Sequence, residues 1–207
     1  MKTLTKEMQS AITPTMALNL LKDGNKRFVN NLKINRNLLQ QANDTSDGQH
    51  PFAVILSCID SRTSAELIFD QGLGDIFSAR IAGNIVNDDI LGSMEFGCKV
   101  AGAKIIVVLG HTKCGAVKGA CDNVALGNLT GLIEKIKPAV NQETTTTENR
   151  NSSNAIFVEN VAELNVSLSV KNILLKSTIL ADMVKNEEIT IVGGIHNISS
   201  GEVKFFE

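Results

Sequence analysis

The stretch FAVILSCIDSR, residues 52–62, joins a short apolar run to a group of reactive side chains. A second stretch, IIVVLGHTKCG at residues 105–115, repeats this arrangement. Short continuous apolar runs are typical of strands that are buried on both faces, as in a parallel sheet. We therefore expect each group of reactive side chains to lie where a buried strand leaves the sheet.

Apolar runs and helical patterns alternate on both sides of these two stretches. This alternation predicts an α/β fold with a largely parallel central sheet, an antiparallel edge strand and flanking helices. The predicted strands span residues 52–57, 76–81, 104–109 and 188–193, with a hairpin partner at 201–206. The predicted helices span residues 15–31, 62–70, 88–102, 115–123, 128–140 and 155–186, the last with a break near 169–171.

Two segments lack this periodicity. Residues 32–50 are polar and predict a helix fragment followed by a loop. Residues 142–154 are rich in Thr and Asn, which predicts an exposed loop. The length of 207 residues suits one domain with a sizeable core.

Composition narrows the classes of function. The net charge of −2 gives no electrostatic reason to expect binding to nucleic acid or to an anionic membrane. No apolar run is long enough to cross a bilayer, and the first residues lack the apolar core of a signal peptide. We therefore expect a cytoplasmic protein, in which the four cysteines are more suited to metal binding or burial than to disulfides.

Three side chains of the two stretches are candidate zinc ligands: Cys58, His111 and Cys114. Thiolate and imidazole are common zinc ligands, and three of them leave a fourth position open for chemistry. In open α/β sheets, ligands bind beyond the carboxyl ends of the strands, where both stretches end. The alternative is two buried thiols and a surface imidazole, but it leaves Asp60 and Arg62 directly after a strand without a reason.

The remaining cysteines and histidines fit such a site less well. Cys121 lies seven residues beyond the second candidate thiol on a predicted helix, a separation of roughly 10 Å. Cys98 falls inside a helical pattern, and burial in the core is expected for both thiols. His50 starts the strand that leads to the first candidate thiol, about 26 Å away. His196 is expected to be structural, with a site role as the alternative.

The chain resembles the β-class carbonic anhydrases. The resemblance rests on Cys-x-Asp-Ser-Arg at 58–62 and His-x-x-Cys-Gly at 111–115. It extends to GNKRF at 24–28, GQHP at 48–51, DQG at 70–72, Ala79-Arg80 and GGIH at 193–196. Either main motif alone is a weak signal, whereas the two in this order are specific, and nearly the whole chain is covered.

The resemblance implies reversible hydration of CO₂ to bicarbonate and a proton, by attack of a zinc-bound hydroxide. Zn²⁺ is the implied cofactor, held by the three candidate ligands. Asp60 would accept the hydrogen of the hydroxide, and Arg62 would keep Asp60 ionised through a two-point pair. We expect this open form of the site near neutral pH. The alternative role of Asp60 and Arg62 is a plain surface ion pair, worth at most about 1 kcal/mol.

Further site residues are implied by the same resemblance. Phe77, Ala82 and Phe96 match positions that line the CO₂ pocket, with core packing as their alternative role. Gly115 would allow close approach to the backbone, or would simply start a helix. Gln49 matches a glutamine that reaches the zinc site of the neighbouring subunit and donates a hydrogen bond to substrate oxygen.

The resemblance also implies an assembly, a homodimer or homotetramer, whose N-terminal helices pack on a neighbouring subunit. Within the single domain, residues 1–45 would form this helical arm and residues 46–207 the zinc-binding α/β core. Ile55, Arg80 and His196 match a bicarbonate-binding regulatory site that a subgroup builds from tryptophan, arginine and tyrosine. Since only the arginine remains, we expect no such site in its usual form and an interface role for Arg80.

Two other functions are compatible with these residues. One is a hydrolase of CS₂ or COS on the same scaffold, because the metal chemistry is similar. The other is a noncatalytic zinc-binding module in which Asp60 permanently closes the site.

Overall fold

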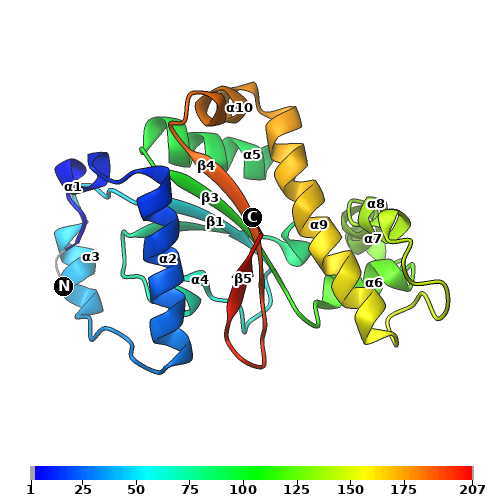
Figure 1. Cartoon of the computed structure of the whole chain (residues 1–207). Coiled ribbons are helices and arrows are strands. Elements are labelled where there is room, and N and C mark those ends of the chain that lie inside the picture. Colours follow the sequence, from blue (N-terminus) through cyan, green and yellow to red (C-terminus); the bar gives the residue numbers. More distant parts are fainter. Residues whose placement is uncertain (1–2, 207) are drawn as a thin grey trace.

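The computed structural model describes residues 3–206 and has a five-stranded sheet at its centre, in the order β2-β1-β3-β4-β5 (Figure 1). Neighbouring strands are parallel except for β5, which runs antiparallel to β4. The strands are β1 (Ala53–Ser57), β2 (Ile76–Arg80), β3 (Ile105–His111), β4 (Thr190–His196) and β5 (Val203–Phe205). The predicted α/β fold, with a largely parallel sheet and an antiparallel edge strand, is confirmed.

Helices cover both faces of the sheet (Figure 1). One face packs against α2 (Pro14–Val29) and α4 (Ala65–Ile68), and the other against α5 (Asp88–Glu95), α9 (Ala155–Lys176) and α10 (Thr178–Lys185). All five residues of β1 and all seven of β3 are therefore buried, which explains their unbroken apolar sequences. The helices α6 (Gly115–Cys121), α7 (Gly127–Ile133) and α8 (Lys137–Gln142) enclose a further apolar cluster with α9.

Shorter elements complete the chain. They are helix α1 (Lys6–Ser10), helix α3 (Leu38–Asp44), a 3₁₀ turn at Ala82–Asn84 and a π-helical turn at Phe96–Val100. The predicted helix 128–140 is split into α7 and α8, and the predicted helix 62–70 is reduced to α4. Among the helices of residues 3–206, none combines the length and apolar composition that a membrane span requires.

The break in the long C-terminal helix lies at Ser177, so the predicted break near residues 169–171 is wrong. The Ser177 hydroxyl accepts a hydrogen bond from the backbone N–H of Leu180 at 3.2 Å and donates one to Glu95 at 2.5 Å. Serine is a favoured N-cap, because its oxygen satisfies an N–H that has no partner in the first turn. The break between α9 and α10 is thus fixed by the N-cap that Ser177 gives to α10 and by the hydrogen bond from Ser177 to Glu95 of α5.

Strand β4 continues to His196, beyond the predicted end at residue 193, and passes through two glycines. A Cβ at Gly193 would lie 2.7 Å from Cγ1 of Val166, and a Cβ at Gly110 in β3 would lie 2.6 Å from Cγ2 of the same valine. The two glycines of β4 therefore do not end that strand, and Gly193 and Gly110 have a packing role. Because neither has a side chain, α9 packs close to the sheet and Val166 contacts both β3 and β4.

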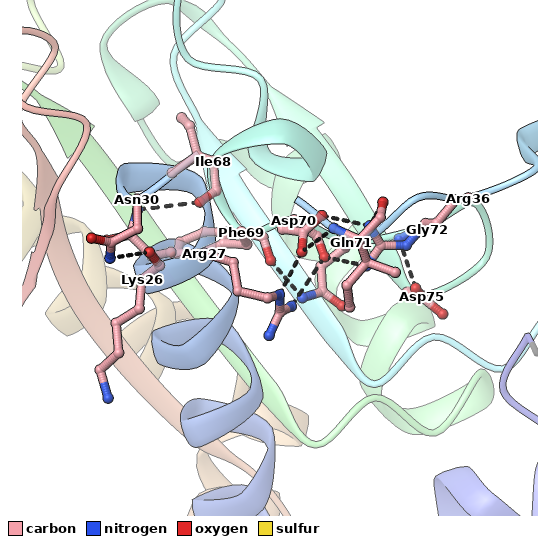
Figure 2. Close-up of polar contacts among 12 residues, drawn as sticks. Lys26, Arg27, Asn30, Arg36, Ile68, Phe69, Asp70, Gln71, Gly72 and Asp75 are labelled. Carbon is pink, nitrogen blue, oxygen red and sulfur yellow. Dashed lines mark hydrogen bonds and ion pairs between the residues drawn. The ribbon is translucent and has the colours of Figure 1, made fainter. Parts of the chain in front are cut away.

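Helix α2 belongs to the core of its own chain. Ala17 and Leu21 are fully buried in one cluster with Ile55 of β1. An ion-pair cluster links the last turn of α2 to the segments that follow: Asp70 accepts hydrogen bonds from Arg27 and Arg36, each at 2.5 Å (Figure 2). Contact of the N-terminal helices with a neighbouring subunit, and the division at residue 45, stay predictions.

Candidate metal centre

Cys58, His111 and Cys114 come together at the carboxyl end of the parallel sheet. One potential ligand atom from each lies within 4.8 Å of the other two. Strands β1 and β3 are neighbours, so the residue after β1 and the last residue of β3 reach the same edge. The second thiol follows at the start of α6. All three residues are buried, with exposed fractions of 4% for Cys58 and 1% for the other two.

The imidazole of His111 is oriented for metal binding. Its Nδ1 lies 2.9 Å from the backbone carbonyl oxygen of Thr112, a contact that assigns the proton to Nδ1. Its Nε2 is buried and has no hydrogen-bond partner among residues 3–206. A buried polar atom without a partner costs free energy, and a bound metal ion would supply the missing partner. A second-sphere carbonyl on the other ring nitrogen is the usual arrangement of a zinc-bound histidine.

The two thiols lie close together and shift each other's pKa in opposite directions. The hydrogen bond from Cys114 lowers the pKa of Cys58 to about 4, against the effect of burial, with smaller contributions from His111 and the backbone N–H of Gly83. The pKa of Cys114 is raised in return, because it keeps the proton and is buried. The lowered pKa favours the thiolate form of Cys58, which is the form that binds a metal. Two sulfurs and one imidazole nitrogen, closely grouped and buried, fit Zn²⁺.

Asp60 and Arg62 form the predicted two-point pair beside the first thiol. Arg62 Nε lies 2.9 Å from Oδ1 of Asp60, and Nη2 lies 2.8 Å from Oδ2. The backbone N–H of Arg62 also donates to Oδ1, at 3.0 Å. These hydrogen bonds hold the pKa of Asp60 well below its usual range. The carboxylate is thus ionised and can only accept hydrogen bonds.

Two residues, Arg80 and Thr63, support this loop, a role that the sequence did not predict for either. Arg80 donates to the carbonyl oxygens of Cys58, at 3.1 Å, and Asp60, at 2.7 Å. The Thr63 hydroxyl donates to the same two carbonyls, at 3.2 Å and 2.9 Å. Arg80 pairs with Ser57 in the β1–β2 register, so its place at a strand end was the available signal. In this chain Arg80 braces the loop, whereas its expected interface role stays a prediction.

His196 lies opposite His111 in the β3–β4 register and is 3% exposed. Burial, together with the nearby His111, lowers the pKa of His196 to about 4, so the ring is neutral near pH 7. It does not line the cavity described below. Both ring nitrogens of His196 are buried without a hydrogen-bond partner among residues 3–206, and the structural role expected of this residue stays a prediction.

A cavity of about 360 Å³ opens beside Cys58 and Asp60. Ala82 and Gly115, both expected in the substrate pocket, line it. The rest of its wall is made of small or apolar residues: Ile59, Ala116, Gly119, Val124, Leu129 and Ile133. An apolar cavity with few donors suits a small apolar ligand.

The other three expected pocket residues lie elsewhere in this chain. The rings of Phe77 and Phe96 are 6.2 Å apart and line a separate cavity of about 650 Å³. Phe96 is 54% exposed. Gln49 is exposed in the segment before β1. Within residues 3–206 of one chain, none of the three lines the cavity at Cys58.

Comparison with known proteins gives one consistent family. The carbonic anhydrase family model matches residues 53–203. The carbonic anhydrase of Mycolicibacterium smegmatis is 32% identical over 197 residues, which cover 92% of both chains. Carbonic anhydrase 2 of Mycobacterium tuberculosis (strain H37Rv) is 33% identical over 194 residues, covering 91% of this chain and 90% of the relative.

A solved structure agrees with these relatives. The β-carbonic anhydrase CafA of Aspergillus fumigatus superposes with a TM-score of 0.73 at 25% identity, covering 93% of this chain and 90% of the other. The matched region of the family model includes both thiols, the imidazole and the Asp60–Arg62 pair. The chain therefore belongs to the β-class carbonic anhydrase family.

Proposed function

We propose that this protein catalyses the reversible hydration of CO₂ to bicarbonate and a proton, with zinc held by Cys58, His111 and Cys114. The observation that carries the proposal is the convergence of these three buried ligands within 4.8 Å of one another, in a chain of this family. Bound zinc supplies the Lewis acidity that makes water nucleophilic at neutral pH.

Asp60 orients the attacking oxygen. Because both of its oxygens are bound by Arg62, the carboxylate is ionised and fixed, and it can accept a hydrogen from water or hydroxide but cannot donate one. The lone pair of the attacking oxygen is then free to face the substrate. Ala82 and the apolar wall of the cavity receive CO₂ without offering competing hydrogen bonds.

Stopped-flow CO₂ hydration, combined with metal analysis of the purified protein, tests the proposal. We expect rapid turnover and one zinc per chain. Hydrolysis of CS₂ or COS without CO₂ hydration would instead support the hydrolase. Tight zinc binding without turnover at pH 8–9 would support the noncatalytic module.

Asp60→Asn is expected to lower kcat/KM for CO₂ hydration by about 10²-fold without loss of zinc. The amide brings two donor hydrogens to a position that must only accept, and it cannot keep the two-point pair with Arg62. Stopped-flow assays and zinc analysis of the same sample measure both effects. Asp23→Asn is the matched control, because Asp23 forms an exposed pair with Lys26 away from the metal centre. Wild-type turnover in Asp60→Asn would refute this role.

We further propose a homodimer or homotetramer, in which Gln49, Phe77 and Phe96 complete the site of a neighbouring subunit. In support, these residues do not line the cavity of their own chain, and Phe96 is largely exposed. Exposed leucines that follow α2 supply apolar surface for the N-terminal helices to contact the neighbour: Leu32, Leu38 and Leu39. A cytoplasmic location is part of the proposal, supported by four free cysteines.

Two variants, one weakly active and one inactive, are expected to restore activity when they share a dimer. Gln49→Ala alone should lower kcat/KM by about 10- to 100-fold, because a donor to substrate oxygen is lost. Cys114→Ala alone should lack zinc. Co-expressed in equal amounts, they should recover about a quarter of wild-type activity, since half of the dimers are mixed and each holds one complete site.

Differently tagged chains allow the mixed dimer to be purified and assayed by itself. No recovery in that species, with the Cys114→Ala chain folded and paired, would place the action of Gln49 within its own chain. A monomeric mass in sedimentation analysis would refute the assembly itself.

A further inference from the structure

Two polar side chains interrupt the buried face of α9. Asn165 and Ser169 are 3% and 4% exposed, and they lie one helical turn apart on a face that also buries Val166 and Ile173. Burying an amide or a hydroxyl costs free energy unless it is hydrogen-bonded. Their hydrogen-bond partners therefore show which part of the chain this helix face fixes in place.

Both side chains donate to the backbone of the 3₁₀ turn that follows β2. The Asn165 amide nitrogen lies 2.8 Å from the carbonyl oxygen of Gly83, and the Ser169 hydroxyl lies 3.3 Å from that of Asn84. Gly83 has a φ of +68°, and a Cβ there would lie 2.6 Å from Cδ1 of Ile136. Only glycine fits this position, so the turn is fixed between α9 and Ile136.

The fixed turn directs one N–H at the metal centre. The backbone nitrogen of Gly83 lies 3.4 Å from Sγ of Cys58, and its hydrogen points at the sulfur. A hydrogen bond to a ligand thiolate withdraws electron density from the sulfur, so the metal keeps more of its Lewis acidity. Two thiolates make zinc a weaker acid than neutral ligands do, and such a donor compensates for part of this loss.

We propose that Asn165 is a positioning residue that acts through Gly83 on Cys58. By holding the Gly83 carbonyl, Asn165 keeps the Gly83 N–H aimed at the ligand sulfur and so limits the electron donation from Cys58 to the metal. Asn165 does not line the cavity, so it acts on the metal ligand and not on substrate. The inference rests on the proposed metal site, but it does not depend on CO₂ being the substrate.

The test uses the full-length protein loaded with Co²⁺ in place of zinc, since thiolate-to-cobalt charge-transfer absorption reports electron donation by sulfur. Asn165→Leu removes the donor at similar volume, and Asn165→Ala leaves room for a water if the leucine variant fails to fold. In both, the band should move to longer wavelength. Ser169→Ala is the matched control, because it loses a buried donor from the same helix face while the bond to Gly83 is kept. Its band should stay in place.

The zinc-loaded variants add a second readout. The pH at which kcat/KM is half-maximal should rise in the Asn165 variants, with about a 10-fold loss of activity at pH 7 that is largely recovered at high pH. A purely structural role would lower activity equally at all pH values.

An unchanged cobalt band in a folded Asn165 variant, or an equal shift in Ser169→Ala, would overturn the inference. A shifted band in a protein that never hydrates CO₂ would uphold the inference and refute the proposed function. If the Asn165 variants kept wild-type turnover and their cobalt band did not shift, the proposed function would be upheld and the inference refuted.

Discussion

Replacing Cys114 with alanine is expected to remove zinc and to lower CO₂ hydration by more than about 10³-fold, because the nucleophile that the metal makes at neutral pH is lost. The side chain is one of the three proposed ligands, and the two remaining donors would not form a closed zinc site. The fold should survive, since a small buried side chain is lost at a cost of about 1 kcal/mol. Zinc content, stopped-flow rates and circular dichroism of one sample measure the three effects.

Cys121→Ala is the matched control for this variant. Cys121 is also buried, at 4% exposed, and ends the same helix that begins after Cys114. It stands outside the ligand group, and burial raises its pKa to about 11, so it behaves as a neutral core thiol. Zinc and activity should both stay at wild-type levels. If Cys114→Ala kept one zinc per chain, or if Cys121→Ala lost it, the ligand set would be wrong.

Asp70→Ala is expected to lower the free energy of unfolding by about 3–5 kcal/mol, because removing one partner of a buried ion pair leaves the other uncompensated. The side chains of Asp70 and Arg36 are 3% and 7% exposed, and Arg27 also binds the carboxylate (Figure 2). Urea denaturation followed by circular dichroism measures the change. Asp23→Ala removes an exposed pair and should cost less than about 1 kcal/mol. Equal costs for the two variants would contradict the argument.

The stabilisation by Asp70 should depend on pH. Burial alone would raise the pKa of Asp70, but the hydrogen bonds from Arg27 and Arg36 outweigh it, so the pKa is lowered. The unfolded chain takes up the proton near the ordinary pKa of about 3.9, above the pKa in the folded state. The contribution is therefore complete at pH 7 and is lost as the pH falls below about 4. The difference in unfolding free energy between wild type and Asp70→Asn should shrink over that range.

The parts of the fold that could be predicted are those fixed by local pattern. Strands β1 and β3 are buried on both faces, so their apolar runs could be recognised in the sequence. The candidate metal ligands could be predicted because they lie where these strands end. The break at Ser177 was missed because it depends on a hydrogen bond to Glu95, which comes from α5. No periodicity records such a contact.

Contacts between distant segments account for the remaining differences at the site. The sequence indicated an interface role for Arg80, whereas its hydrogen bonds to two carbonyls depend on the path of the loop after β1. Asn165 reads as one polar residue in a helix, and only the fold brings it to Gly83. Phe77 and Phe96 were expected at the pocket, but within one chain Phe96 begins the π-helical turn and its ring lies 6.2 Å from that of Phe77, away from the cavity at Cys58.

The packing of Val166 against Gly110 and Gly193 determines the distance between α9 and the sheet. Val166 is adjacent to Asn165, so the height of the helix above β3 and β4 also fixes the reach of the amide toward Gly83. If Asn165 acts on Cys58 as proposed, the acidity of the bound metal depends on the absence of side chains at two glycines that lie away from the metal centre. On the same proposal, a substitution that adds even a methyl group to Gly110 or Gly193 would push α9 away from the sheet and weaken the hydrogen bond from Asn165 to Gly83.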